Sequence, residues 1–169
     1  IDRLHEGDML SITLHDTPTQ MQLSEIDVPI LYEDTDIIIY NKPADMACHP
    51  SKSLQQDTLA NVFAAYCAKK GIDLTCRILN RLDKDTSGAV LIPKNAFAAA
   101  ALTGQVEKLY LAAVSGAPNP LEGIIDAPID RPDPIDLRRA VMQSGKRAIT
   151  EYKTVSQHQS YSMRACTLP

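Results

Sequence analysis

The segment from Arg81 to Gly88 holds the residues of this chain best suited to chemistry. It lies between the apolar runs 77–79 and 89–92, so we predict a short bend between two strands. Charged and hydroxyl side chains in such a bend cost stability unless they are solvated or partnered, and catalytic residues tend to lie in bends of this kind. Asp83 is the candidate for an ionised carboxylate. An ordinary polar turn closed by Gly88 has a similar composition, so this segment alone does not distinguish a catalytic loop from a structural turn.

Four blocks of the sequence together match a known family. Arg81-Leu82-Asp83, followed after two residues by Thr86-Ser87-Gly88, resembles the signature of RNA pseudouridine synthases of the RluA type, which have a His at the position of Asn80. The four blocks occur in the family's order and cover roughly residues 26 to 169. The other three are residues 30–50, which include Asn41-Lys42-Pro43-Ala44 and His49-Pro50, residues 107–112, and residues 123–129 with 145–150.

The resemblance implies a fold and a reaction. The fold is α+β, with a mixed, mostly antiparallel sheet and short flanking helices, as in a pseudouridine synthase catalytic domain. The reaction isomerises specific uridines in structured RNA, either rRNA or tRNA, to pseudouridine. Since no group enters or leaves, we expect no redox cofactor and no metal. Asp83 stands at the family's catalytic aspartate, whose carboxylate acts as a nucleophile or starts glycosidic cleavage. The sequence leaves open whether it attacks the sugar or the base.

Further residues match positions that face the substrate in this family. Tyr110 matches the active-site tyrosine, whose ring can stack on a flipped base and whose phenol can assist removal of the proton from carbon 5. Without the match, a Tyr on an alternating strand is more often a core residue. Arg81 is expected to fill the space left by the flipped base or to bind a phosphate, against the alternative of a salt bridge with Asp85. The expected contacts to RNA or substrate are Arg81, Lys42, His49, Thr86 and Lys108.

Two features depart from the family pattern. Asp45 replaces a Gly, which puts the tightness of that turn in question. An ionised Asp83 in a closed pocket needs a cationic partner, and the family supplies an Arg or Lys from a block that would begin just past Pro169. We therefore expect that the chain is a fragment and that the whole protein contains this block.

The N-terminal residues predict an appendage. Residues 7–14 alternate apolar and polar side chains and resemble the last strand of an S4-like RNA-binding module. We interpret residues 1–14 as a remnant of that module, residues 15–27 as a linker, and residues 28–169 as the catalytic domain, truncated at its C-terminus.

Helix signals are clear in two places. Asp57 or Thr58 caps a helix that runs to about Lys70 and stops at Gly71. Asn95 caps a second helix that ends near Gly104. We further predict strands at 36–41, 89–92 and 108–115, a surface loop over 116–147, and a hairpin of 148–156 and 160–168.

Composition narrows the function classes. The net charge of −4 argues against nonspecific nucleic-acid binding but permits a local basic groove. No apolar run approaches the ~20 residues that span a bilayer. The four cysteines lack a Cys-x-x-Cys pair, which argues against zinc and favours a cytoplasmic protein with reduced thiols. We expect a monomer whose partner is RNA, with no membrane contact. Cys48, beside His49, is either a thiol nucleophile or simply buried.

Two other functions fit parts of the sequence. Asp83-Lys84-Asp85-Thr86 loosely resembles the Asp-x-Asp-x-Thr loop of Mg-dependent haloacid-dehalogenase-type phosphatases, whose paired carboxylates help to bind Mg²⁺. That class requires strands that alternate with helices in a doubly wound fold, which this sequence does not predict. The second alternative is a noncatalytic RNA-binding module with the same fold, against which the presence of both Asp83 and Tyr110 argues.

Overall fold

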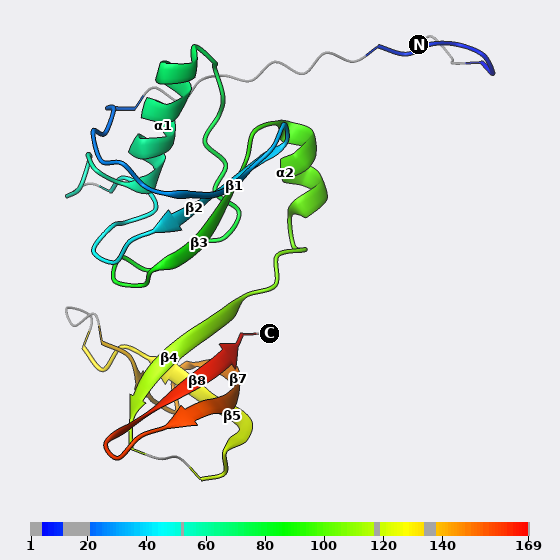
Figure 1. Cartoon of the computed structure of the whole chain (residues 1–169). Coiled ribbons are helices and arrows are strands. Elements are labelled where there is room, and N and C mark those ends of the chain that lie inside the picture. The colour runs from blue at the N-terminus through cyan, green and yellow to red at the C-terminus, as the bar shows by residue number, and fades with distance from the viewer. Residues whose placement is uncertain (1–4, 12–20, 52, 117–118, 134–137, 169) are drawn as a thin grey trace. The chain divides into compact units, whose positions relative to one another are not determined.

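The computed structural model describes residues 5–11, 21–51, 53–116, 119–133 and 138–168 (Figure 1). The chain divides into two compact units, residues 1–106 and 107–169. The α+β class predicted from the sequence is confirmed, and every described pair of strands is antiparallel. No helix in the described ranges is long and apolar enough to cross a membrane.

The first unit is a three-stranded sheet with two helices. Its strands, in the spatial order β1-β2-β3, are β1 (Ile30–Glu33), β2 (Ile37–Lys42) and β3 (Gly88–Pro93). The helices are α1 (Leu59–Lys70) and α2 (Ala96–Leu102). Figure 1 shows α1 lying against the sheet. Ile38 and Tyr40 of β2 pair with Ile92 and Val90 of β3, and these four side chains are buried together with Phe63 of α1.

The caps of α1 explain where the helix begins and ends. The Thr58 hydroxyl accepts a hydrogen bond from the backbone N–H of Asn61, and the Asn61 side chain accepts one from the Thr58 N–H, which forms a capping box. Gly71 ends the helix in the left-handed conformation, at φ 67°. Asn95 caps α2 as predicted, by accepting from the N–H of Ala98.

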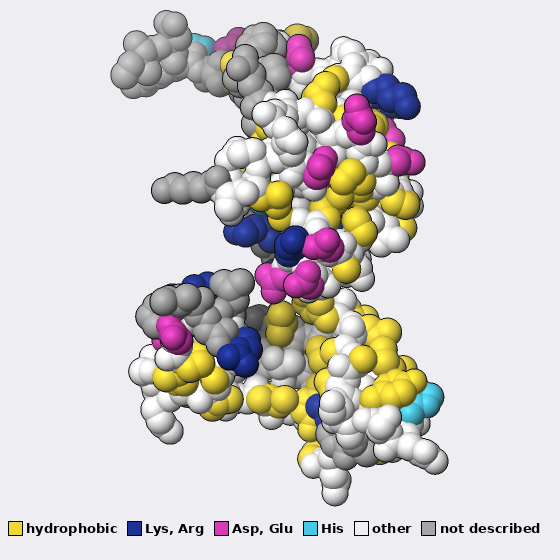
Figure 2. Space-filling model, turned by 90° about the vertical axis from the view of Figure 1, so that its left-hand side faces the viewer, with side chains coloured by type: hydrophobic (Ala, Val, Ile, Leu, Met, Phe, Trp, Pro, Cys, Tyr) yellow, Lys and Arg dark blue, Asp and Glu magenta, His cyan; other side chains and the backbone are white. Residues whose placement is uncertain are grey.

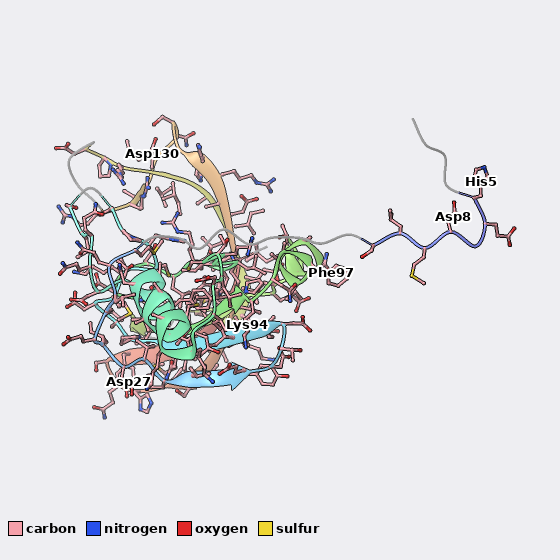
Figure 3. The ribbon with its side chains drawn as sticks, turned by 90° about the horizontal axis from the view of Figure 1, so that it is seen from above. His5, Asp8, Asp27, Lys94, Phe97 and Asp130 are labelled. Carbon is pink, nitrogen blue, oxygen red and sulfur yellow. The ribbon has the colours of Figure 1, made fainter. Side chains whose placement is uncertain are left out.

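The sheet and α2 are joined through the residues after β3. Lys94 lies just past the end of β3 (Figure 3) and donates to the Glu33 carboxylate at 3.1 Å and to the Asp34 carbonyl at 2.8 Å. The Asn95 side chain donates to Asp36 at 2.7 Å. These bonds fix the start of α2 against the turn between β1 and β2.

Two predicted strands of the first unit are not found among the described residues. Residues 77–79 form no strand, and this segment is joined to β3 by the Leu79 N–H and by the side chain of Asn80. In the N-terminal prediction for residues 7–14, residues 7–11 form no strand and residues 12–14 lie outside the described ranges. The predicted linker is described from residue 21 onward and is irregular. It is nevertheless bound to α1, since the Gln22 carbonyl accepts a hydrogen bond from the Asn61 side chain at 2.8 Å. Ser24 also donates to Asp57, just before the helix, at 2.8 Å.

The second unit is a five-stranded sheet in the order β4-β8-β7-β5-β6. The strands are β4 (Leu109–Ser115), β5 (Glu122–Asp130), β6 (Ala140–Val141), β7 (Lys146–Gln157) and β8 (Tyr161–Thr167). The predicted hairpin of β7 and β8 is confirmed. The predicted surface loop over 116–147 is wrong, because it contains β5 and β6. Pro128 lies within β5, next to the point where β6 begins to pair with that strand, and its carbonyl accepts a hydrogen bond from the Met142 N–H.

The two faces of this sheet differ in exposure. Leu109 and Leu111 of β4 are 74% and 66% exposed, whereas Tyr110 and Ala112, which point to the other face, are half-buried. Figure 2 shows hydrophobic side chains on the surface of this unit. The face that carries Tyr110 also carries Arg164 and Cys166 of β8, which lie opposite Ala112 and Tyr110. The face with Tyr110 is therefore the more buried of the two.

Candidate active site

Asp83 lies at the start of a tight turn between residue 80 and β3. The N–H of Thr86 donates to the Asp83 carbonyl at 3.1 Å, and the Asp83 side chain is exposed. Gly88 then opens β3 with φ 134°, a conformation that L side chains rarely adopt. The carboxylate is therefore presented to solvent at the end of a buried strand pair, on a loop whose backbone is bonded on both sides.

Lys42 lies beneath this loop and is fully buried. Its ammonium donates to the carbonyls of Pro43 at 2.8 Å, Met46 at 2.6 Å and Lys84 at 3.0 Å. All three N–H donors are thereby used. The expected contact of Lys42 with RNA is wrong for this structure, because period-two alternation with Ile38 and Tyr40 turns its side chain into the core.

The charge of Lys42 is held in a low-dielectric environment. Burial lowers the pKa of Lys42 below its usual value, while Cys48, Asp85 and Asp83 act in the opposite direction. Two of those groups are carboxylates of the loop itself. Lys42 thus links the segment after β2 to the segment that carries Asp83, both through the Lys84 carbonyl and through charge.

Cys48 fixes the residue just before Asp83. Its thiol donates to the Leu82 carbonyl at 3.3 Å, and the Leu82 N–H donates to the same sulfur at 3.4 Å. Cys48 is 4% exposed, so of the two interpretations of this residue the structure supports burial. No pattern in the sequence indicated that Cys48 would pair with Leu82, which is 34 residues away.

Asn80 fixes the other side of the loop. Its amide donates to the Ala89 carbonyl at 2.8 Å and accepts from the Leu91 N–H at 2.8 Å. The N–H of Leu79 also donates to the Leu91 carbonyl at 3.1 Å. Asn80 therefore joins the segment before the Asp83 loop to β3. It occupies the position at which the family described above has a His.

Asp45 resolves the first departure from the family pattern. It adopts φ 64°, the left-handed conformation that a Gly would supply, and Asp tolerates this region better than most residues do. Its carboxylate forms an ion pair with Lys84 at 2.7 Å, and the hydrogen bond from Lys84 lowers the pKa of Asp45. The tight turn is retained, and it contacts the loop of Asp83.

His49 and Arg81 lie near one another at the edge of the loop. Burial lowers the pKa of His49 from 6.5, and the positive charge of Arg81 lowers it further. Since His49 is half-buried and neutral at pH 7, it can donate and accept hydrogen bonds without adding charge. Arg81 is exposed, and no described residue forms an ion pair with it, so the alternative of a salt bridge with Asp85 is not found. Thr86 is half-buried in the same turn.

Tyr110 and Lys108 belong to the second unit. Tyr110 is half-buried in β4, opposite Cys166 of β8. Lys108 directly precedes β4 and is exposed. The structure therefore groups Asp83, Arg81, His49 and Thr86 in one unit, and Tyr110 and Lys108 in the other.

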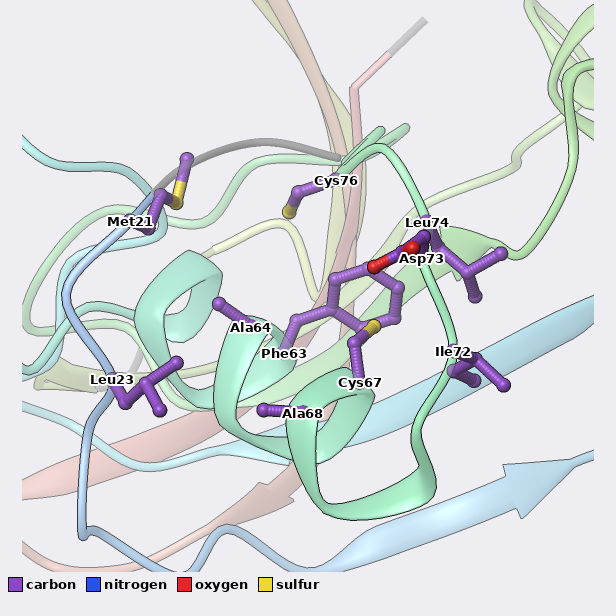
Figure 4. Close-up of a pocket in the computed structure, with 10 residues that line it drawn as sticks. All are labelled: Met21, Leu23, Phe63, Ala64, Cys67, Ala68, Ile72, Asp73, Leu74 and Cys76. Atoms are coloured by element: carbon purple, nitrogen blue, oxygen red, sulfur yellow. The ribbon is translucent and has the colours of Figure 1, made fainter. Parts of the chain in front are cut away.

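A separate pocket of about 170 Å³ lies along α1 (Figure 4). None of the residues of the Asp83 loop lines it. The pocket is lined by Met21, Leu23, Phe63, Ala64, Cys67, Ala68, Ile72, Asp73, Leu74 and Cys76. Burial raises the pKa of Cys67 to about 11 and that of Cys76 to about 12, so both thiols are protonated and poorly nucleophilic at neutral pH.

The described part of the chain holds no group of three or more His, Cys, Asp or Glu side chains arranged for a metal ion.

Comparison with known proteins decides the family. The profile of the RNA pseudouridylate synthase family matches residues 36–168, which include the Asp83 loop and Tyr110. The chain belongs to this family. The family assignment from the four sequence blocks is thereby confirmed.

Relatives and solved structures support the assignment. The chain is 33% identical over 98% of its length to the uncharacterized RNA pseudouridine synthase YlyB of Bacillus subtilis, of which it covers 58%. It is 34% identical, over 89% of its length, to the ribosomal large subunit pseudouridine synthase D of Zymomonas mobilis, of which it covers 51%. The human RNA pseudouridylate synthase domain containing 4 shares the fold, with a TM-score of 0.63, 23% identity, and coverage of 82% of this chain and 58% of that one.

The chain thus spans about half the length of the curated relatives that it matches. The phosphatase alternative is not supported, because a doubly wound fold needs a parallel sheet and every described strand pair is antiparallel.

Proposed function

We propose that the whole protein isomerises specific uridines in structured RNA, either rRNA or tRNA, to pseudouridine, with Asp83 as the catalytic carboxylate. The observation that carries the proposal is the support of the Asp83 loop. Lys42 holds the Lys84 carbonyl and Cys48 holds both backbone groups of Leu82, so the residues on either side of Asp83 are fixed while its carboxylate faces solvent. A side chain held in this way can meet a substrate without reorganising.

The proposed reaction rearranges bonds within a single nucleotide. The bond from ribose carbon 1′ to N1 of uracil breaks, the base turns, and a bond from carbon 1′ to carbon 5 forms. The proton on carbon 5 leaves, and N1 gains a proton, so atoms and electrons balance without an oxidant. The Asp83 carboxylate acts as the nucleophile in the cleavage step. Tyr110 stacks on the base and assists removal of the proton from carbon 5.

The remaining predicted residues serve RNA binding in this proposal. Arg81 and Lys108 are exposed cations that can contact phosphates, and Arg81 can also occupy the place of the flipped base. His49 and Thr86 offer neutral hydrogen-bonding groups beside Asp83. We further propose that residues 28–169 belong to the catalytic domain, since Val28 is already part of the buried core. No described cysteine forms a disulfide, which fits the reducing cytoplasm that we propose as the location of this protein. We also propose that it is a monomer.

The test compares Asp83→Asn with Asp85→Asn, which removes the same charge two residues along the exposed turn. Unmodified ribosomal and transfer RNA transcripts carry tritium at uridine carbon 5, and release of the label reports loss of that proton. We expect Asp83→Asn of the whole protein to lose on the order of 10⁴-fold in turnover, as removal of a nucleophile does elsewhere. Its RNA affinity and melting temperature should stay near the wild-type values, and Asp85→Asn should stay within a few-fold in turnover.

Three results would count against the proposal. Turnover of Asp83→Asn within tenfold of wild type would remove Asp83 from the catalytic role. Equal losses in the two variants would point to loop charge in general. RNA binding by the wild-type protein without release from any transcript would favour the noncatalytic module.

A further inference from the structure

Arg164, in the middle of β8, is a buried cation that has no carboxylate partner among the described residues. It is 7% exposed, and its guanidinium carbon lies 4.0 Å from the centroid of the Tyr152 ring. Its Nε is buried and has no hydrogen-bond partner in the described part of the chain. No described residue accepts a hydrogen bond from its terminal nitrogens either.

A second unpartnered group lies directly across from it. Thr154 of β7 pairs with Arg164 in the β7–β8 register, so the two side chains share one face of the sheet. The Thr154 hydroxyl is also buried and has no hydrogen-bond partner among the described residues. Two adjacent buried polar groups that both lack a partner are rare in folded proteins and call for an explanation.

The position of Tyr152 explains how Arg164 is oriented. Gly123 of β5 lies opposite Tyr152, and a Cβ at Gly123 would come within 3.2 Å of the phenol oxygen. The absence of that Cβ lets the ring lie over β5, where its hydroxyl donates to the Pro120 carbonyl at 3.3 Å. The guanidinium then stacks on this fixed ring, and the ring covers its flat surface but leaves its N–H edges for in-plane hydrogen bonds.

The face that carries these groups is also the face of Tyr110. Arg164 pairs with Ala112 and Tyr110 pairs with Cys166, so Arg164 and Tyr110 are diagonal neighbours on adjacent strands. Diagonal neighbours lie about 7–8 Å apart, within reach of long side chains. A ligand that meets the Tyr110 ring therefore lies beside the free edge of Arg164.

We propose that Arg164, with the Thr154 hydroxyl beside it, binds a backbone phosphate of the RNA next to the nucleotide that Tyr110 contacts. The inference rests on the proposed function, which supplies RNA as the anionic partner. A guanidinium keeps its charge in proteins, and burying it without an anion costs stability that the ring only partly offsets. A phosphate offers two oxygens that match the fork of N–H donors. The bound phosphate satisfies the charge that the described residues leave unpaired.

The experiment measures the salt dependence of RNA affinity for Arg164→Gln and for a matched control, Arg147→Gln. Arg147 lies in the same sheet but is exposed and paired with Asp126 at 2.5 Å, so both variants remove one positive charge from the same unit. Dissociation constants of the whole protein for the ribosomal and transfer RNA transcripts are measured over a series of KCl concentrations. We expect Arg164→Gln to weaken binding about tenfold and to reduce the slope against salt by roughly 0.7–0.9, the value for one phosphate. Arg147→Gln should leave the slope unchanged.

Further variants keep the test decisive. Arg164→Gln should melt at or above the wild-type temperature, because it removes an unpaired buried charge. Arg164→Lys keeps the charge but loses the fork, so it should keep the slope and lose affinity severalfold. Thr154→Val, which keeps the shape of the side chain, should also weaken binding. The phosphate site would be overturned if Arg164→Gln left the slope against salt unchanged. If the Gln variant does not fold, wild-type RNA affinity of Arg164→Lys would overturn it instead. Tritium release by the wild-type protein reports on the proposed function separately, so the two failures are distinguishable.

Discussion

Replacing Lys42 by Met should loosen the Asp83 loop, and the effect can be estimated from the three bonds of the ammonium. Hydrogen bonds to a charged group contribute about 1.5–3 kcal/mol each, and burying the ammonium costs several kcal/mol in return. Met fills a similar volume but leaves the carbonyls of Pro43, Met46 and Lys84 unpartnered. We therefore expect the free energy of unfolding to fall by about 2–4 kcal/mol, close to the loss on removing one partner of a buried charged pair.

The assay is urea unfolding of the whole protein, followed by circular dichroism. With a slope of about 1–3 kcal/mol per molar urea, the midpoint should fall by roughly 1–2 M. Lys84→Met is the matched control, since Lys84 is exposed and its ion pair with Asp45 is screened by solvent and contributes little to stability. In the tritium assay, Lys42→Met should lose turnover more than RNA affinity, because it releases the backbone beside Asp83. A Lys42→Met protein with wild-type stability and turnover would refute the idea that this ammonium holds the loop.

Two further predictions concern single residues with a defined environment. Because the pKa of His49 is lowered below 6.5 in the folded chain, the unfolded chain binds the proton first, and stability falls as the pH drops below 6.5. His49→Gln should therefore lose less stability than wild type between pH 7 and pH 5 in urea titrations, and equal losses would show that His49 is solvated. Gly145→Ala would place its Cβ 2.6 Å from the backbone of Ile129, so it should cost about 2–3 kcal/mol or more. Gly123→Ala, which meets only a tyrosine side chain at 3.2 Å, should cost less in the same thermal melts.

Local sequence determined the parts of this protein that depend on neighbouring residues. The capping residue Thr58 and the terminating Gly71 set the limits of α1, because capping uses groups within one helical turn. The position of Asp83 in a short polar turn, and the positive φ of Gly88, followed from the types of a few adjacent residues. The family also followed from ordered local blocks, and the profile match over residues 36–168 confirms it.

Only the tertiary structure decided how the candidate site is held. Because Lys42 is charged, the sequence favoured a position on the surface. In the structure its side chain is buried and donates to the carbonyl of Lys84, 42 residues away. Cys48 likewise meets Leu82 across 34 residues. β5 was predicted as part of a surface loop because residues 116–147 hold many Pro and charged residues, and only its pairing with β7 places it in the sheet. A buried polar group is stable only where distant backbone groups satisfy it, and no local pattern in a sequence records where those groups will be.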